Sequence, residues 1–379
     1  MSISVFRGLN TVTDPMRLGM EWLVQADNVD ITDTGGLAKR TGYTQALAGA
    51  FTGAYSTADF GRMYVVDGGV LKAMSGSSTA VALQTGLRGV EMHWTEINDQ
   101  VFFNDGLDSG IIRADNTVLD WRWTPPSAPT LTTVTGSLAP GLYQVRCTNR
   151  LSDGRATGAG EAAEIVIAEG EGLRITGAGD NVFIAPAGST SYQYAGSGPV
   201  LTWNARPDEL GADLNDTFND PLPLDASVIQ AWRGRIYAAQ YFPSLQQSAV
   251  WFSQPLGFHL FDLSTAFFLV PGHVLMLAPH DDALVIGTDE AVLAYDGKQL
   301  SVLAEYGVVA GHHWSLDEQR LLFWSTRGLC AAMPFANLTE RQVSVAPGVS
   351  AGGTVVLSGG QKRYLVALKQ GGAAFNSHS

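Results

Sequence analysis

The chain has 379 residues, of which 45% are hydrophobic, so it can bury a large core, and this composition excludes an intrinsically disordered protein. Its 23 basic and 36 acidic residues give a net charge of −13, which excludes the electrostatic footprint of an ordinary nucleic-acid-binding protein and disfavours an anionic membrane surface. The two cysteines, Cys147 and Cys330, lie far apart in apolar segments, which excludes a disulfide framework and a cysteine-based zinc site and predicts buried free thiols.

The remaining composition favours an all-β fold with many turns. Glycine accounts for 43 residues, and charged residues are only 16% of the chain. The first residues lack the apolar segment of a secretion signal, and no apolar run approaches the ~20 residues of a membrane span. We therefore expect a protein made in the cytoplasm with no export route of its own.

Residues 1–45 are predicted to form an N-terminal arm. Val29 and Ile31 alternate with polar residues, which is typical of a half-buried strand, and Gly35 and Gly36 can supply the positive φ of a hairpin turn. The arm has too little apolar content for its own core, so we expect it to join subunits or dock on a neighbour by adding to a sheet edge. The candidate contact residues are Phe6, Arg7, Arg17, Lys39 and Arg40.

Residues 46–124 carry the first hairpins of a recurring pattern. Residues 61–71 and 99–112 each combine a polar start, an apolar strand, a turn and a return strand. A stiff proline-rich segment, residues 125–129, then predicts a linker.

Residues 125–223 have a different sequence pattern, in which short predicted strands follow one another at even spacing. Tyr143, Val145 and Cys147 alternate along one predicted strand, and residues 152–154 supply a turn. About seven such strands favour a β-sandwich, which resembles fibronectin type III or immunoglobulin-like modules. Because blade-like hairpins lie on both sides, we interpret this sandwich as an insertion.

The hairpin pattern resumes over residues 224–370, before a tail at 371–379 that we expect to be flexible. In residues 231–255 the predicted strands at 236–238 and 250–252 flank a polar turn at 240–248. Repeats about 40 residues apart are typical of β-propeller blades, whereas unrelated hairpins in one large sandwich are the alternative. The predicted fold class is all-β, a β-propeller-like domain with an inserted fibronectin III/Ig-like β-sandwich. The further repeats are residues 282–295, 319–329 and 361–368.

The sequence offers few candidates for catalysis. His280-Asp281-Asp282 follows a proline and is better read as a solvated turn, and His312 and His313 would point to opposite faces of a strand. No phosphate-binding loop, nucleophile elbow or zinc pattern occurs. We therefore expect no enzyme activity, cofactor or metal. The aromatic residues that could stack on a sugar, or else fill the core, are Trp232, Trp251, Phe323 and Trp324.

Several segments together resemble the tubular or nozzle proteins of short-tailed bacteriophages and related propeller-bearing virion proteins. Four segments lie in the arm and three in the second half of the chain. They are residues 8–10, 15–18, 26–31, 35–43, 234–239, 252–255 and 283–288. This chain is shorter than the larger nozzle proteins, so a smaller tail role is also open.

The resemblance implies a structural component of the virion tail. It implies a ring of copies, usually six, below the portal and adaptor proteins, which forms part of the DNA-ejection conduit and a platform for tail fibre or spike proteins. The excess acidic residues could face the passing DNA, or they could merely cover the outer surface of the protein. The protein would not bind this DNA sequence-specifically. The alternative function is a glycan- or receptor-binding propeller. The candidates for acidic residues facing the conduit are Asp281, Asp282, Asp289 and Glu290.

Overall fold

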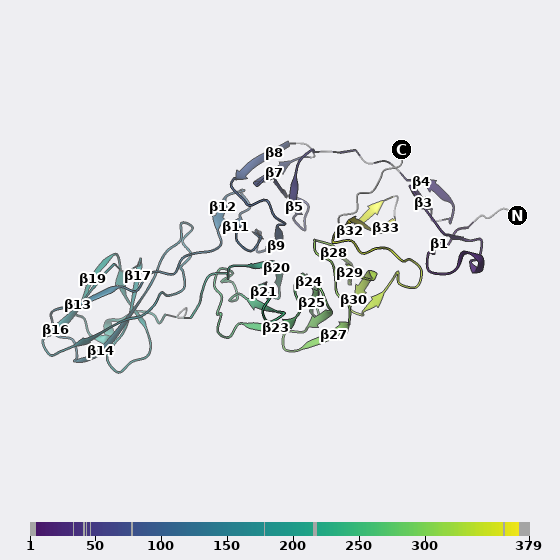
Figure 1. The fold of residues 1–379 in the computed structure, drawn as a ribbon. Helices are drawn as coiled ribbons and strands as arrows, with labels where there is room; N and C mark the ends of the chain where they lie inside the picture. Colours follow the sequence, from purple (N-terminus) through teal and green to yellow (C-terminus); the bar gives the residue numbers. More distant parts are fainter. Residues whose placement is uncertain are drawn as a thin grey trace.

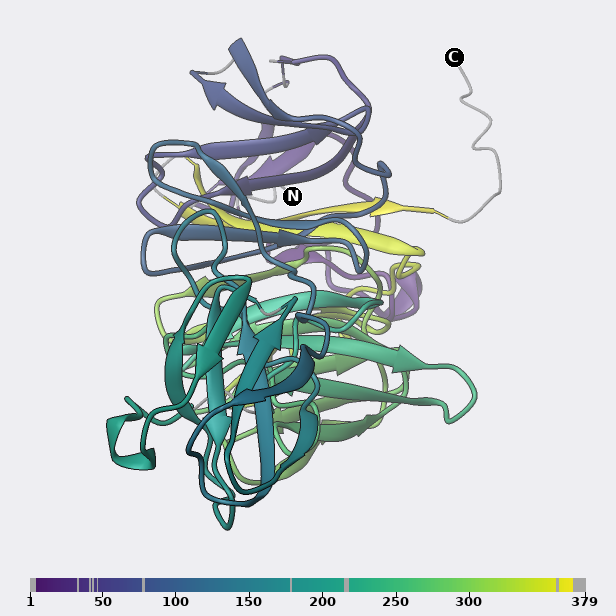
Figure 2. The same ribbon diagram turned by 90° about the vertical axis from the view of Figure 1, so that its left-hand side faces the viewer.

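The fold is all-β, a β-propeller-like domain with an inserted β-sandwich, as the sequence predicts. The structure is a computed structural model that describes residues 5–370 apart from residues 33, 41, 43, 46, 77–78, 178, 215–217 and 359–360. The expected flexible tail at 371–379 lies outside the described residues. Figure 1 shows the ring of propeller sheets with the sandwich to its left, and Figure 2 shows the sandwich in front of the propeller.

Five antiparallel four-stranded sheets and one two-stranded sheet form the propeller, in chain order. The first two sheets contain β5 (Phe51–Ser56), β6 (Met63–Asp67), β7 (Val70–Ser75), β8 (Thr79–Gln84), and β9 (His93–Ile97), β10 (Gln100–Asn104), β11 (Ser109–Ile112), β12 (Val118–Asp120). The third and fourth contain β20 (Ala226–Trp232), β21 (Arg235–Phe242), β22 (Gln247–Phe252), β23 (Phe267–Pro271), and β24 (Val274–Pro279), β25 (Leu284–Thr288), β26 (Val292–Tyr295), β27 (Leu300–Ala304). The fifth and sixth contain β28 (Trp314–Asp317), β29 (Arg320–Ser325), β30 (Gly328–Ala332), β31 (Ala336–Asn337), and β32 (Ser350–Ser358), β33 (Gln361–Lys369).

Tight turns fix the register within these sheets. Gly68 and Gly69 connect β6 to β7 with φ of 57° and 77°, a conformation that glycine adopts without steric cost. The turn between β21 and β22 is shorter than the sequence predicts. Tyr241 pairs with Ser248 and Phe242 pairs with Gln247, so the expected polar turn is largely strand.

Each propeller sheet is buried on two faces because adjacent residues on a strand point in opposite directions. In β10, Phe102 packs in the cluster shared with the third sheet, whereas Phe103 packs against the first sheet. Similar buried clusters join the third sheet to the fourth, the fourth to the fifth and the fifth to the sixth. Burial of each large apolar side chain contributes about 1.5–3 kcal/mol, so these clusters hold the ring together.

The inserted sandwich has two sheets around one core. Its strand order is β13-β16-β19 in one sheet and β15-β14-β17-β18 in the other. Tyr143, Val145 and Cys147 point inward together, as the sequence predicts. The strands are β13 (Thr130–Thr135), β14 (Gly141–Thr148), β15 (Ala163–Ile167), β16 (Glu171–Thr176), β17 (Asn181–Ala185), β18 (Gln193–Ser197) and β19 (Val200–Trp203), and the 3-10 turn η2 (Pro207–Glu209) follows them.

The N-terminal arm lies against the last two propeller sheets. Its backbone is tied there by the amide of Thr11, which donates to the carbonyl oxygen of Gln342 at 2.8 Å. In addition, the Ser344 amide donates to the Thr11 hydroxyl at 2.9 Å. The arm contains β1 (Gly8–Leu9), the 3-10 turn η1 (Pro15–Arg17), β2 (Trp22–Leu23), β3 (Val29–Ile31) and β4 (Leu37–Lys39).

Candidate functional site

The first strand of each propeller sheet faces the centre of the ring. In Figure 1 the labels β5, β9, β20, β24, β28 and β32 encircle the propeller axis. Strand β20 contacts both β9 and β24, and β28 contacts β32. The turns that follow β20, β24 and β28 meet at one end of the axis, where two neighbouring pockets open.

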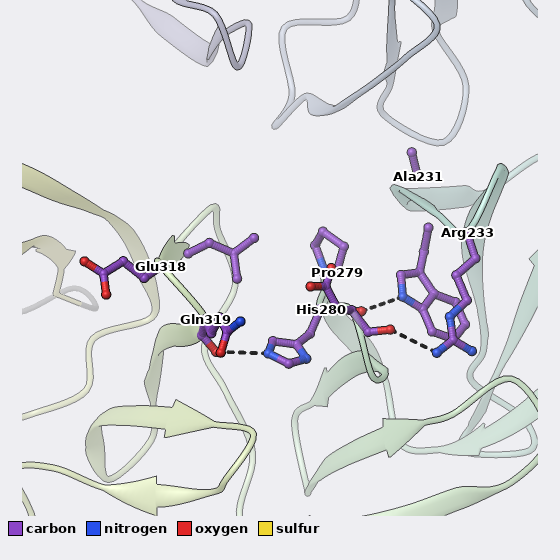
Figure 3. A pocket seen from close by; sticks show the side chains of 9 residues that line it. Ala231, Arg233, Pro279, His280, Glu318 and Gln319 are labelled. Atoms are coloured by element: carbon purple, nitrogen blue, oxygen red, sulfur yellow. Dashed lines mark hydrogen bonds between the residues drawn. The ribbon is translucent and has the colours of Figure 1, made fainter.

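The larger of these two hollows, here the mouth pocket, has a volume of about 420 Å³. It lies between the ends of β20, β24 and β28, and Figure 3 shows its side chains. The lining residues are Ala231, Trp232, Arg233, Pro279, His280, Asp281, Leu316, Glu318 and Gln319.

Arg233 and Trp232 form one wall of the mouth pocket. The guanidinium of Arg233 lies over the Trp232 ring, 4.4 Å from its centroid, in a cation–π contact. It also donates to the carbonyl oxygens of Asp296 at 2.7 Å and Asp281 at 2.9 Å. The Trp232 indole donates to the His280 carbonyl oxygen at 2.7 Å. Arg233 therefore fastens the turn after β24, and its partners are main-chain oxygens.

His280 forms the opposite wall. Its Nδ1 accepts from the Asp282 amide at 3.2 Å, so its Nε2 carries the proton and donates to the Gln319 carbonyl oxygen at 3.0 Å. Both ring nitrogens are occupied by main-chain groups, so His280 acts here as a structural bridge between two turns.

The second hollow, here the axis pocket, has a volume of about 290 Å³ and lies closer to the centre of the ring. It contacts four aromatic residues, and none of its lining residues is Asp, Glu, Lys or Arg. The lining residues are Tyr55, Ser56, Thr57, Ala58, Phe60, Trp94, Thr95, Gln230, His312, Trp314, Ser315, Leu316 and Thr354.

Aromatic stacking and hydrogen bonds hold the walls of the axis pocket. Tyr55 stacks on Trp94 with ring centroids 5.9 Å apart, and the buried Trp94 indole nitrogen has no hydrogen-bond partner among the described residues. The Thr95 hydroxyl oxygen accepts from the Ala231 amide at 2.8 Å and from the Gln230 side chain at 3.2 Å. The pocket is thus a neutral, aromatic hollow with hydroxyl and amide groups.

A third, much smaller cavity shares Trp94, Gln230, His312 and Trp314 with the axis pocket. His93, Ile229, Met276 and Gly311 also line this cavity, whose volume is only about 20 Å³. Burial, and to a lesser degree the neighbouring His312, lower the pKa of His93 to about 4. His93 is therefore neutral at pH 7.

The acidic candidates from the sequence do not lie together. Asp281 and Asp282 lie in the turn that follows β24. Strand β25 runs antiparallel to β24, so the turn that follows it, with Asp289 and Glu290, lies at the opposite end of the fourth sheet. The Asp289 carboxylate accepts from the His273 amide at 2.7 Å. The structure therefore brings each pair together but separates the two pairs.

The five arm candidates occupy different surroundings. Arg7 lies 4.0 Å from Glu21, and Arg40 lies 3.2 Å from Asp30, so both have partners within the arm. Phe6 is half-buried and its amide donates to the Gly35 carbonyl oxygen. The remaining two, Arg17 and Lys39, are solvent-exposed.

Sequence reasoning missed the most exposed part of the arm. Met16 is 93% exposed and Met20 is 62% exposed, and other apolar side chains of the arm are also uncovered. The sequence gives no clear signal of this exposure, because Met16, Leu18, Met20 and Trp22 alternate in the way that is typical of a half-buried strand. The other exposed apolar residues of the arm are Val5, Val12, Val24 and Leu37.

The aromatic candidates divide between core and pocket. Phe323 and Trp324 are buried in the core between the propeller sheets, so they cannot stack on a ligand. Trp251 donates to the Gln240 side chain away from both pockets. Trp232 alone of the four lines the mouth pocket. The aromatic residues of the axis pocket escaped sequence analysis because they come from separate sheets.

Within the described part of the chain, no group of three or more His, Cys, Asp or Glu side chains is placed to hold a metal ion. No helix among those residues is long and apolar enough to cross a membrane.

No protein-family model and no curated protein matches the chain. It is similar to the extracellular domain of the putative hybrid two component system BT4673 from B. thetaiotaomicron, at 13% identity and a TM-score of 0.32, over 82% of this chain and 36% of that one. It is also similar to Kluyveromyces lactis Hsv2, at 11% identity and a TM-score of 0.32, over 81% and 87% of the two chains. The similarity to apo AztD from Citrobacter koseri has 12% identity and a TM-score of 0.29, over 78% and 87%. The chain therefore spans well under half of the BT4673 domain.

Proposed function

We propose that the chain is a non-enzymatic structural subunit of a bacteriophage tail. In this proposal, copies of the chain form a nozzle-like ring in the virion. The partners of the ring are portal or adaptor proteins above it and fibre or spike proteins around it. The exposed apolar surface of the arm is the observation that carries the proposal. Met16 and Met20 are 93% and 62% exposed, and an arm that carries several exposed apolar side chains is typical of a segment that docks on a partner. The sequence resemblance to tail nozzle proteins supplies the kind of assembly.

The acidic residues place a condition on this assembly. In this proposal the conduit for DNA lies between copies of the chain. Asp281 and Asp282 stand at one end of the fourth sheet, and Asp289 and Glu290 stand at the other. A conduit that runs along the side of this sheet would meet both pairs, whereas a conduit at one end of the propeller would meet only one.

Acid along the conduit would keep DNA from adhering. Basic residues hold DNA through release of its counterions, and acidic residues avoid this. Screening limits the repulsion to about 8–10 Å at physiological salt, so only acidic residues at the conduit surface have an effect.

The state of assembly tests the proposal. The mass of the full-length chain, measured by sedimentation, is expected to be that of a closed ring. Deletion of residues 1–43 is expected to give monomers whose circular dichroism still shows the propeller. A full-length chain that stays monomeric at all concentrations would contradict the proposal, and so would normal assembly after the deletion.

The axis pocket favours a second candidate function, which is binding of a neutral glycan. Its aromatic faces can cover the apolar face of a sugar ring, and its hydroxyl and amide groups can bond sugar hydroxyls. Phe60 stands at this pocket with 87% of its surface exposed and a φ of 56°, which is unusual for a bulky residue.

A glycan-binding assay with a matched pair of variants tests this second function. Phe60→Gly is expected to weaken binding without loss of thermal stability, because glycine accepts the positive φ. The control is Leu256→Gly, which removes another exposed apolar side chain at a positive φ of 60° outside both pockets. Equal binding by the two variants, or no glycan binding by the parent protein, would reject this function.

A further inference from the structure

The sixth propeller sheet is incomplete. It contains only β32 and β33, which pair over nine residues each, whereas the other five propeller sheets contain four strands. Among the described residues, no third strand pairs with the outer edge of β33. An uncovered edge of this length offers a row of backbone donors and acceptors to another strand.

In the described part of the chain, the sixth sheet also lacks a buried apolar cluster with the first sheet. Buried apolar clusters join each consecutive pair of propeller sheets from the first to the sixth. No such cluster of described residues joins β32 and β33 to the first sheet. The face of the sixth sheet away from the fifth includes Leu365, which is 41% exposed, and the exposed Ala367 and Gly352.

The arm carries the two strands that the sixth sheet lacks. β3 and β4 form a separate antiparallel hairpin, and all three residues of β4 are exposed. Figure 1 shows this hairpin beyond β33, on the side away from the ring centre. Asp30 of β3 lies 3.0 Å from the guanidinium of Arg363 on β33, so the two hairpins are complementary in charge where they meet.

Within one chain this contact is weak. Between their described residues, no strand pairing joins the two hairpins, and the ion pair between them is partly open to solvent, with Arg363 34% and Asp30 25% exposed, so screening by water limits its contribution to stability. The arm's apolar side chains stay uncovered in the same arrangement. Residues 40–50 connect the arm to β5, which lies in the first sheet. The hydrogen bonds of Thr11 with Gln342 and Ser344 hold another part of the arm, so the β3–β4 hairpin itself has few contacts with its own propeller to lose when it is exchanged between copies.

We propose that the β3–β4 hairpin of an adjacent copy completes the sixth sheet by pairing with the edge of β33. This inference rests on the proposed ring and names the contact that builds it. Each copy gives its arm to one neighbour and receives an arm from the other. Such a head-to-tail contact generates a ring when its rotation closes.

Cross-linking between two tagged versions of the full-length chain tests the exchange. One version carries Asp30→Cys and the other carries Arg363→Cys, and the two are co-expressed and treated with a short bismaleimide. Cys147 and Cys330 are buried, so they give little background. The expected product is a covalent pair of chains that carries both tags.

Two controls interpret the outcome. Asp208→Cys, in the sandwich, combined with Arg363→Cys is expected to give no product with both tags. A single chain that carries both Asp30→Cys and Arg363→Cys reports contact within one copy. If the parent protein forms rings but only this intrachain product appears, the proposed exchange of hairpins is rejected, whereas the proposed ring is not. If neither product appears, the hairpin does not lie at β33 and the inference is also wrong. A parent protein that sediments as a monomer rejects the proposed function itself.

Discussion

The indole nitrogen of Trp123 donates a hydrogen bond to the carbonyl oxygen of His259 at 2.7 Å, across 136 positions of the chain. The neighbouring Trp121 does the same with Phe258 at 2.8 Å. These bonds fasten the segment before the sandwich to the third propeller sheet. The sandwich therefore leaves the propeller from a fixed point.

Arg122, between these tryptophans, is expected to be the main polar fastening of this junction. Its guanidinium donates to the carbonyl oxygens of Gly106 at 2.9 Å, Pro223 at 3.1 Å and Leu222 at 3.2 Å. Arg122→Met leaves these acceptors without their donor, at a cost of about 2–4 kcal/mol in the free energy of unfolding of the propeller. The measurement is chemical denaturation followed by tryptophan fluorescence. Arg174→Met, at an exposed position in the sandwich, is the control; equal stability of the two variants would contradict the prediction.

His313 is expected to make the propeller less stable in acid. It is fully buried, its Nδ1 accepts from the Trp324 amide, and its Nε2 donates to the Val309 carbonyl oxygen. Burial lowers the pKa of His313 from 6.5 to about 4. The unfolded chain therefore binds a proton below pH 6.5 that the folded chain does not bind until about pH 4. The contribution of His313 to the free energy of unfolding is complete above pH 6.5. It falls by up to about 3 kcal/mol as the pH drops from 6.5 to about 4.

The variant His313→Gln isolates this effect. Glutamine keeps a donor and an acceptor but does not titrate, so the variant is expected to be less stable at pH 7 and less sensitive to pH between 4 and 6.5. Thermal melts across this range measure both quantities. Identical pH slopes for the parent and the variant would show that His313 is not the responsible group.

The methionines of the arm are expected to stabilise the assembly and not the folded chain. The double variant Met16→Ser, Met20→Ser removes apolar surface that is exposed in the single chain, so the melting temperature of the chain is expected to stay unchanged. The ring of the variant is expected to dissociate at a higher protein concentration than the parent ring. Sedimentation over a concentration series measures this. Val166→Ser, exposed on the sandwich, is the control and leaves dissociation unchanged. A lower melting temperature without any change in assembly would contradict the prediction.

Both cysteine thiols are expected to resist modification in the folded protein. Burial raises the pKa of Cys147 and of Cys330, so little thiolate is available at pH 7–8. A maleimide reagent should label neither residue before denaturation and both afterwards, as counted by mass spectrometry. Rapid labelling of the native protein would show that one of the two strands opens readily.

The hairpins of the propeller were predictable because their signals are local. Glycine turns and alternating apolar residues fix which segments pair, and the repeat near 40 residues indicates that the pairs stack in a ring. The strand ends between β21 and β22 were misplaced because polar residues such as Gln240 and Gln247 pair in the sheet as well as apolar ones. Local patterns carry little information on where a polar strand ends.

The pockets and the incomplete sixth sheet were not predictable from the sequence. Tyr55, Trp94 and Trp314 come from three different sheets, so only the closed arrangement of those sheets brings them to one hollow. The separation of Asp281 from Asp289 likewise depends on the direction in which β25 runs. The last repeat of the sequence resembles the earlier ones, and its two missing strands are evident only from the sheet order.

Electron microscopy of the purified full-length chain tests the central claim most directly. The account predicts closed rings of several copies with a central opening, and an averaged map in which the opening lies between propellers and not along the axis of any one of them. Single propellers with their attached sandwiches, with no ring at any concentration, would contradict it.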